Sequence, residues 1–297
     1  MKVVVTGGTG FLGSALVNRL RHDRHDVTVL TRNPRAPGEV QWNPAVARGP
    51  WTSTIDGADA VIHLAGAPIA EGRWTERRKA AIRDSRVEST NTIVAAIASA
   101  RRPPGVLISG SAIGIYGDRG DDTVTEETPP GSGFLAAVCV EWERGTLAVP
   151  PATRLVLLRT GVALDRSGGA LPMMAMPFRF FAGGPIGSGR QYVSWIHRDD
   201  WVELTCWCVA TAAVSGPLNV TAPNPVTNRE FARTLGRVLR RPAFIPTPAF
   251  ALRLALGEMA DEMLLSGQRV LPAKALAHGF TFRYPTLEAA LREIFSA

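Results

Sequence analysis

Three glycines near the start of the chain have the spacing of a phosphate-binding turn. Gly7, Gly10 and Gly13 follow a run of three valines and precede a segment with apolar residues on one helical face. A strand that turns through glycines into a helix lets backbone N–H groups approach a pyrophosphate, and the positive helix N-terminus attracts it. The sequence therefore predicts a dinucleotide site, because such a site requires this strand–turn–helix context. The alternatives are a turn that binds nothing, or a signal peptide, whose apolar core would be longer than three valines.

The residue that selects the nucleotide is expected where the second strand ends, at Thr31-Arg32. NAD sites place an acidic residue near this position to accept the ribose hydroxyls, and this chain has Arg32 instead. A guanidinium group suits a 2′-phosphate and would leave NAD without its acceptor. We therefore predict NADP (NADPH) as the cofactor, with a solvated loop role for Arg32 as the alternative.

Composition and charge disfavour several other classes of protein. The chain has 297 residues, 45% of them hydrophobic, and no apolar run approaches the ~20 residues of a membrane helix. The net charge of +7 rests on 30 arginines and three lysines that are scattered along the chain, without the basic stripe of a nucleic-acid binder. The three cysteines give neither a disulfide framework nor zinc spacing. We expect a cytoplasmic protein with no metal, membrane or nucleic-acid partner.

The first half of the chain alternates strand-like and helix-like segments. Short, continuous apolar strands separated by helices are typical of a parallel sheet that is covered on both faces. We therefore predict an α/β fold with a Rossmann-type doubly wound parallel sheet. The predicted strands are residues 3–5, 27–30, 60–65, 106–109 and 155–159, and the predicted helices include 75–100 and 134–148.

After about Asp165 the chain becomes rich in glycine and proline, which indicates loops and a change of domain. We expect a smaller, mainly α substrate-side lobe that caps the carboxyl edge of the sheet, where ligands of open α/β sheets bind. The predicted parts are an NADP-binding Rossmann domain at 1–165, to which about 190–221 returns, and the lobe at 166–189 and 222–297.

Two helix starts in this second half carry capping signals. Thr227 and Glu230 have the spacing of a capping box, which predicts a helix that runs to about Leu239. Asp199 or Asp200 is expected to cap the helix that follows it.

Four segments, of which the first is the glycine turn, carry a resemblance to a known superfamily. They are Thr6 to Gly13, His63 to Gly66, Ser109 to Gly117 and Trp195 to Asp200. They are similar to the motifs of the extended short-chain dehydrogenase/reductases, the superfamily of nucleotide-sugar epimerases. A subfamily of epimerase-family (nucleoside-diphosphate-sugar epimerase-like) proteins matches more closely, on Arg73-Trp74-Thr75, Trp142-Glu143 and Gly184 to Gly189 among others. Its members end in a small domain of unknown function, here at about 249–296.

This resemblance implies NADP binding by the glycine turn and by residues at other strand ends. It does not supply a substrate, so the expected partner is a small molecule of unknown identity, and an exposed helix pair would allow a homodimer. The implied cofactor-binding residues are Thr6, Gly7, Gly10, Phe11, Leu12, Gly13, Thr31, Arg32, Leu64, Ala65, Gly66, Arg86 and Val162.

The chain departs from this superfamily at its catalytic pair, Tyr-x-x-x-Lys. In that pair the lysine lowers the pKa of the tyrosine, which then moves a proton near neutral pH. None of the three tyrosines of this chain has a lysine four residues later. Phe134 and Val138 stand in the expected places, and neither side chain can carry a proton.

Three other residues are candidates for the chemistry. Ser111 would hydrogen-bond a substrate, or else satisfy a backbone group in a turn. Tyr116 would donate a proton, although an unassisted phenol with a pKa of about 10 is a poor acid–base group. Glu143 would be an inward-facing carboxylate, or else part of a solvated helix face.

Two hypotheses follow from this pattern. The first is an NADP(H)-dependent oxidoreductase or epimerase in which Ser111 orients the substrate and Tyr116 or a carboxylate such as Glu143 handles the proton. The second is a catalytically silent NADP(H)-binding sensor or regulatory protein, which the missing Tyr–Lys pair favours.

Overall fold

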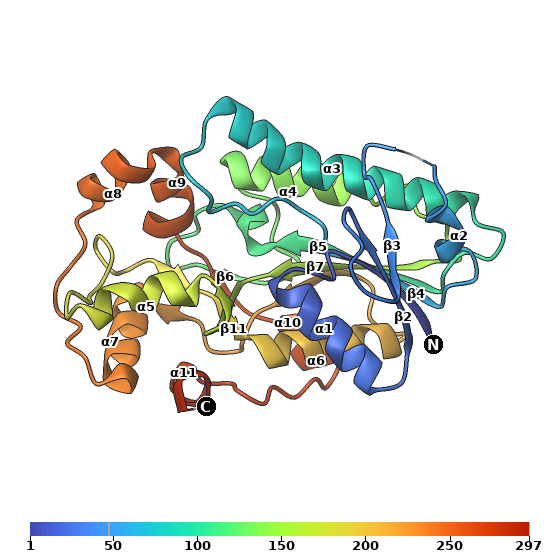
Figure 1. The fold of residues 1–297 in the computed structure, drawn as a ribbon. Helices are drawn as coiled ribbons and strands as arrows, with labels where there is room; N and C mark the ends of the chain where they lie inside the picture. The colour runs from blue at the N-terminus through green and yellow to red at the C-terminus, as the bar shows by residue number, and fades with distance from the viewer. Residues whose placement is uncertain (47, 297) are drawn as a thin grey trace.

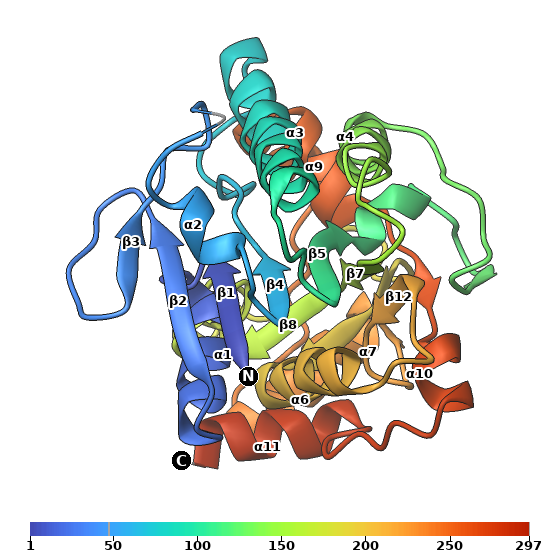
Figure 2. The same cartoon turned by 90° about the vertical axis from the view of Figure 1, so that its right-hand side faces the viewer.

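Seven parallel strands form the central sheet of the computed structural model, which describes residues 1–46 and 48–296. Their order, β12-β7-β5-β4-β1-β2-β3, reverses direction beside the central β1, as in a doubly wound fold (Figure 1 and Figure 2). This order confirms the predicted Rossmann-type architecture. The strands are β1 (Lys2–Thr6), β2 (Asp26–Thr31), β3 (Glu39–Gln41), β4 (Ala60–His63), β5 (Val106–Ala112), β7 (Arg154–Thr160) and β12 (Gly216–Val220).

Helices cover both faces of this sheet (Figure 2). One face carries α1 (Phe11–His22) and α6 (Arg198–Ala210). The other carries α2 (Thr52–Ile55), α3 (Glu76–Ser99) and α4 (Phe134–Arg144). The two predicted helices correspond to α3 and α4, and α4 ends earlier than predicted because Gly145 is its C-cap.

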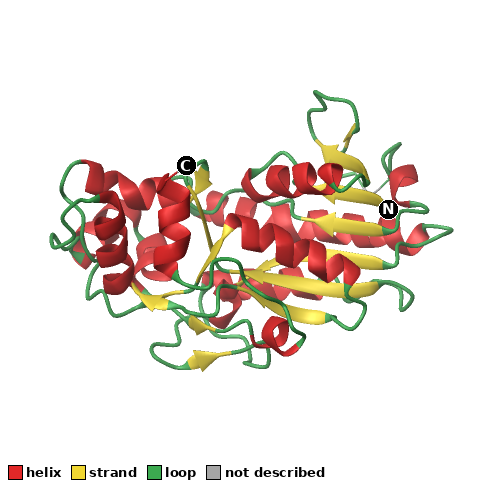
Figure 3. Ribbon diagram, turned by 90° about the horizontal axis from the view of Figure 1, so that it is seen from below, coloured by secondary structure: helices red, strands yellow, loops and turns green. Residues whose placement is uncertain are grey.

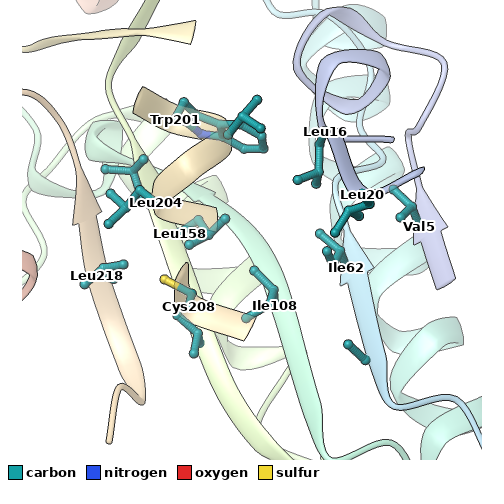
Figure 4. Packing of buried hydrophobic residues seen from close by; sticks show 14 of the residues in the cluster. Val5, Leu16, Leu20, Ile62, Ile108, Leu158, Trp201, Leu204, Cys208 and Leu218 are labelled. Carbon is teal, nitrogen blue, oxygen red and sulfur yellow. The ribbon is translucent and has the colours of Figure 1, made fainter. Parts of the chain in front are cut away.

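Branched apolar side chains fill the space between the sheet and the α1–α6 layer (Figure 4). Val5, Ile62, Ile108 and Leu158 come from four neighbouring strands and pack in one cluster with Trp201 of α6, all of them buried. Burying one such side chain stabilises the fold by roughly 1.5–3 kcal/mol. This packing explains why the strands read as continuous apolar runs rather than as an alternation of apolar and polar residues.

The smaller lobe begins where β7 ends and is mainly helical, as predicted (Figure 3). No helix in residues 1–46 and 48–296 is long and apolar enough to cross a membrane. The lobe holds α5 (Leu171–Arg179), α7 (Asn228–Leu239), α8 (Ala249–Leu256), α9 (Glu258–Ala260), the π-helical turn η2 (Asp261–Leu265) and α11 (Leu287–Ser296). Three small sheets connect segments of the lobe with one another or with the rest of the chain. They are β8 (Val162–Asp165) with β9 (Gly168–Gly169) and β11 (Trp195–His197), β10 (Tyr192–Val193) with β13 (Val226–Thr227), and β14 (Arg269–Val270) with β6 (Thr123–Val124).

After the lobe begins, β12 and α10 also return to the Rossmann sheet, as α6 does. β12 pairs with β7 as the seventh strand of that sheet. The short helix α10 (Ala273–Ala277) packs against β12, and its Ala275 is buried in the main core. The C-terminal part of the chain therefore contacts both the lobe and the sheet.

One predicted helix cap is confirmed and the other is wrong. The Thr227 hydroxyl accepts from Glu230 N, and the Glu230 carboxylate accepts from Thr227 N, which completes the capping box of α7. The cap of α6 is His197, whose Nδ1 accepts from Asp199 N (3.1 Å). Asp200 is buried, and its carboxylate accepts from Arg283 N (2.8 Å) and Tyr284 N (2.9 Å). These two bonds hold the C-terminal segment against α6.

A buried histidine at the end of β4 holds the carboxyl edge of the sheet together. His63 Nδ1 is 2.7 Å from Thr6 Oγ1, and His63 Nε2 is 3.1 Å from Thr90 Oγ1 and 3.2 Å from Ser89 Oγ. A neutral imidazole that accepts at Nδ1 and donates at Nε2 satisfies this arrangement. Burial lowers the pKa of His63 to about 3, so the ring stays neutral at physiological pH.

This shift makes the stability of the protein depend on pH. Between about pH 6.5 and pH 3 the unfolded chain binds a proton at His63 that the folded chain does not bind. His63 therefore destabilises the folded state by up to about 1.4 kcal/mol for each unit by which the pH falls in this window. We expect His63→Gln to flatten the pH dependence of the unfolding free energy, measured by urea denaturation from pH 7 to pH 4.5. The exposed His278→Gln is the control and should keep the wild-type slope; equal slopes for wild type and His63→Gln would contradict the assignment.

Candidate functional site

The turn between β1 and α1 is packed too closely for side chains. A Cβ atom on Gly13 would lie 2.1 Å from the Gly7 carbonyl oxygen, and Gly7 has a φ of +70°. Gly10 N donates to Gly7 O (3.0 Å) and closes the turn. No side chain caps α1, so the N–H groups of its first turn are left for another acceptor. An uncapped helix N-terminus behind a glycine turn attracts a phosphate.

A cavity of about 530 Å³ opens on this turn and on the neighbouring strand ends. Arg32 reaches it from the end of β2, is exposed, and makes no hydrogen bond or ion pair within the described residues 1–46 and 48–296. The cavity thus joins a positive helix end to a free guanidinium. Seven residues that the sequence predicted for the cofactor line it: Gly7, Gly10, Thr31, Arg32, Leu64, Ala65 and Gly66.

Three other predicted cofactor residues shape this cavity from behind or from its edge. Thr6 is buried, and its Oγ1 accepts from the N–H groups of Leu64 (3.2 Å) and Ala65 (3.3 Å). Gly13 lies under the turn, where its missing side chain permits the close approach. Arg86 lies against Gly66, since a Cβ there would be 3.3 Å from Arg86 Cζ.

The remaining predicted residues lie away from the cavity. Phe11 packs beside Gly168 and Gly169, on the opposite side of the turn. Leu12 is half-buried against the main core. Val162 opens β8 and donates its N–H to Ser194 O (2.9 Å). The binding roles of these residues stay predictions.

Sequence reasoning missed a second wall of the cavity, on α3. Arg78, Ser85 and Ser89 line it at spacings of seven and four residues, which places them on one helical face. That spacing of polar residues was a usable signal. Arg78 Nη2 donates to the Pro68 carbonyl oxygen and pairs with Glu71 (3.2 Å). Trp42 and Pro44 complete the opposite wall, beyond β3.

The three predicted catalytic residues meet in one buried network. Ser111 Oγ donates to Glu143 Oε1 (2.6 Å). The Arg159 guanidinium holds the same carboxylate with two bonds, Nε to Oε1 (2.9 Å) and Nη2 to Oε2 (2.8 Å). Arg159 Nη1 also donates to the Tyr116 hydroxyl (2.9 Å), which itself donates to Asn219 Oδ1 (2.7 Å). The network crosses β5, β7 and β12 and ends on α4.

This network has little contact with solvent. The side chains of Arg159 and Glu143 are only 7% and 12% exposed. Tyr116 is completely buried, and burial raises its pKa above the ordinary value, against the opposing effect of Arg159. The sequence indicated Tyr116 as a candidate proton donor, and the structure places its hydroxyl inside the protein.

The start of α4 is covered by the C-terminal part of the chain. The Glu262 carboxylate accepts from Phe134 N (2.9 Å) and Leu135 N (3.1 Å), so it caps α4 across 128 residues of sequence. A cavity of about 410 Å³ lies beside this contact. It is lined by Gly114 and Gly117 after β5, by Ser132, Gly133 and Leu135 at α4, and by residues of α8 and η2 that include Arg253, Asp261 and Glu262.

Apolar packing occupies the place of the missing catalytic pair. The Phe134 ring lies edge-on to Trp74, with the ring centroids 5.1 Å apart. Val138 is buried one turn later on α4. The Lys79 ammonium group stands 5.3 Å from the Phe134 ring and pairs with Glu258. Within the described residues, no tyrosine stands at this position.

Two family models match the chain. The first is the NAD dependent epimerase/dehydratase family, over residues 3–142, which include the glycine turn, α3 and most of α4. The second is a domain of unknown function, DUF1731, over residues 247–294, which cover the segment that caps α4.

Named relatives match over nearly the whole chain. An Arabidopsis thaliana protein, epimerase family protein SDR39U1 homolog, chloroplastic, is 42% identical over 99% of this chain and 86% of its own length. The human epimerase family protein SDR39U1 is 38% identical over 99% of both chains. A crystal structure of the human protein (isoform 2) with NADPH superimposes with a TM-score of 0.92, at 37% identity and 99% coverage of both chains. The chain therefore belongs to the epimerase family proteins, with a segment of the NAD dependent epimerase/dehydratase family at residues 3–142 and the domain DUF1731 at residues 247–294.

Proposed function

We propose that this chain binds NADP(H) and acts as an oxidoreductase or epimerase with a non-standard proton donor. The observation that carries the proposal is Arg32, a free guanidinium on a cavity whose other end is the uncapped N-terminus of α1. The NADPH in the crystal structure of the human relative supports the same choice of nucleotide.

The residues present fit NADP. A pyrophosphate suits the glycine turn, because the Cβ-free backbone of Gly7 and Gly10 leaves room for it and the N–H groups of α1 point outward. A 2′-phosphate suits Arg32 through charge-assisted hydrogen bonds. Among the described residues that line the cavity, the carboxylate is that of Glu71, which pairs with the Arg78 guanidinium. Trp42 and Pro44 offer an apolar wall for the base.

When bound, the nicotinamide ring of NADP(H) supplies or accepts a hydride at a substrate carbon. The second cavity, beside Ser132 and Glu262, is the place that we assign to the substrate. It lies at the start of α4 and at the end of β5, at the carboxyl edge where open α/β sheets bind ligands. Its residues come from both the sheet and DUF1731, so a substrate there would contact both parts.

Within this proposal we assign the Ser111 network mainly to positioning. Glu143 is held by two bonds from Arg159 and one from Ser111, which leaves it little freedom to exchange a proton. Tyr116 has no exposed surface and two fixed partners. The network fixes β5 and β7 against α4, and so fixes the residues that border the substrate cavity. Glu262 is the carboxylate that reaches that cavity.

A second candidate function is favoured by one observation. Phe134 and Val138 stand where the superfamily has the pair that moves the proton; Phe134 packs against an apolar cluster and Val138 is buried. A protein that binds NADPH but performs no turnover, as a sensor of the cofactor, would need no such pair. The three free cysteines suit a reducing compartment under either function.

The nucleotide assignment predicts the effect of Arg32→Ala. Removing a charge-assisted contact to the 2′-phosphate should weaken NADPH and NADP binding roughly 10- to 100-fold and leave the weaker NADH binding unchanged. Calorimetric titration with the four nucleotides measures this. Arg101→Ala, at an exposed arginine after α3, is the matched control and should bind like wild type. Equal affinity of the wild type for NADPH and NADH would refute the role of Arg32.

The positioning role predicts the effect of Glu143→Gln. This change leaves the buried Arg159 cation without its anionic partner, so the unfolding free energy should fall by about 3 kcal/mol or more. The dissociation constant for NADPH should stay within about twofold of wild type, since Glu143 does not line the cofactor cavity. Glu141→Gln, at an exposed neighbour on α4, should change neither quantity. If the unfolding free energy of Glu143→Gln equals that of the wild type, Glu143 is not a positioning residue and becomes a candidate proton donor again.

Turnover separates the enzyme from the sensor. We expect purified protein to oxidise NADPH or reduce NADP with at least one member of a panel of aldehydes, ketones, alcohols and nucleotide sugars. Arg32→Ala should lose this activity at low NADPH concentration and recover it at high concentration, because the change affects binding rather than chemistry. Tight NADPH binding with no turnover across the panel would favour the sensor.

A further inference from the structure

The outer end of the lobe exposes large apolar side chains on several segments. Met173, Met176 and Phe180 are exposed at positions i, i+3 and i+7 along α5 and its end. Phe250 and Leu254 are 72% and 78% exposed on α8, a helix with no buried residue. Figure 1 places α5, α7 and α8 at one end of the molecule, on the left. Large apolar groups gathered in this way mark an interaction surface.

Backbone hydrogen bonds join these segments to one another. Residues 181–187 run beside residues 241–249, with Ile245 N donating to Gly183 O (3.0 Å) and Gly187 N donating to Thr247 O (2.9 Å). The Phe180 end of α5, the exposed Phe244 and the start of α8 therefore lie along one connected stretch of surface. We call the exposed side chains of this stretch the apolar end: Met173, Met176, Phe180, Phe181, Phe244, Phe250 and Leu254.

The apolar end is surrounded by positive charge. Segments 168–197 and 231–257, which hold all of its residues, contain seven arginines and no aspartate or glutamate. Their formal charge of +7 equals the net charge of the whole chain (33 − 26). Arg179 and Arg241 are exposed and form no ion pair within the described residues, and Arg241 Cζ stands 4.7 Å from the centre of the Phe181 ring. Two of the seven, Arg237 and Arg253, pair with acidic residues from outside the two segments.

We propose that the apolar end docks the protein onto the surface of an anionic lipid bilayer. Phenylalanine and leucine side chains enter the boundary between headgroups and acyl chains, while arginines contact the lipid phosphates. A second copy of this chain is disfavoured as the occupant, because it would bring exposed arginines such as Arg179 and Arg241 against the same arginines of the other copy. The contact is peripheral and places no helix across the bilayer. It is independent of the proposed function.

Vesicle co-sedimentation of the full chain tests the proposal. We expect binding to vesicles of phosphatidylcholine with phosphatidylglycerol, weakening as salt is raised, and at least about tenfold less binding to phosphatidylcholine alone. The absence of binding to anionic vesicles at low salt overturns the proposal and points to a protein partner. Binding that is equal for both lipid compositions overturns the role of the arginines.

Two variants and a control locate the contact. Phe180→Ser/Phe244→Ser removes apolar side chains, and Arg179→Gln/Arg241→Gln removes charge; each should lower vesicle partitioning about tenfold or more. Leu147→Ser, at a residue 74% exposed between α4 and β7, is the matched control and should bind vesicles like wild type. An unchanged cooperative unfolding transition in urea shows that each variant is folded. Unchanged partitioning of both double variants overturns the proposal, as does a dimer of the wild type that the Phe180→Ser/Phe244→Ser change abolishes in sedimentation velocity.

Discussion

The backbone contact between Gly13 and the Gly7 carbonyl is the constraint on which the site depends. It brings the first turn of α1 directly under the end of β1, at a distance that admits no Cβ atom. Because the turn is made of backbone, the first turn of α1 carries no side-chain cap, and Gly10 at its start lines the cavity. The buried Thr6–His63 contact then holds the neighbouring strand end in register, so that Leu64 and Ala65 form the adjoining wall.

Carboxylates that satisfy distant backbone groups hold the C-terminal part of the chain in place. Asp200 of α6 binds two N–H groups at residues 283 and 284, and Glu262 of η2 binds two at the start of α4. Each carboxylate supplies a partner to backbone N–H groups. Leaving such groups without a hydrogen bond inside the protein would lower the free energy of unfolding. The DUF1731 segment is therefore joined to the start of α4 through Glu262.

Much of the fold was predictable from local pattern. The Val-rich run, the glycine spacing and the strand–helix alternation predicted the sheet and the glycine turn, and Arg32 predicted a positive wall on the cavity. The α3 wall was missed, because Arg78 and Ser85 lie far from the turn in sequence and ordinary surface helices also carry such residues. The cap of α6 was predicted wrongly, because α6 begins at Arg198, which places Asp199 and Asp200 inside its first turn and leaves the cap position to His197.

Sequence by itself determined that no tyrosine of this chain has a lysine four residues later. It also determined the sheet, since strand patterns and glycine turns are local. Only the tertiary structure decided which polar and charged side chains contact one another. Ser111, Tyr116 and Glu143 are joined by Arg159 of another strand, and Glu262 reaches α4 from the far end of the chain. Such pairings depend on which elements pack together, and that is a property of the whole fold rather than of any one segment.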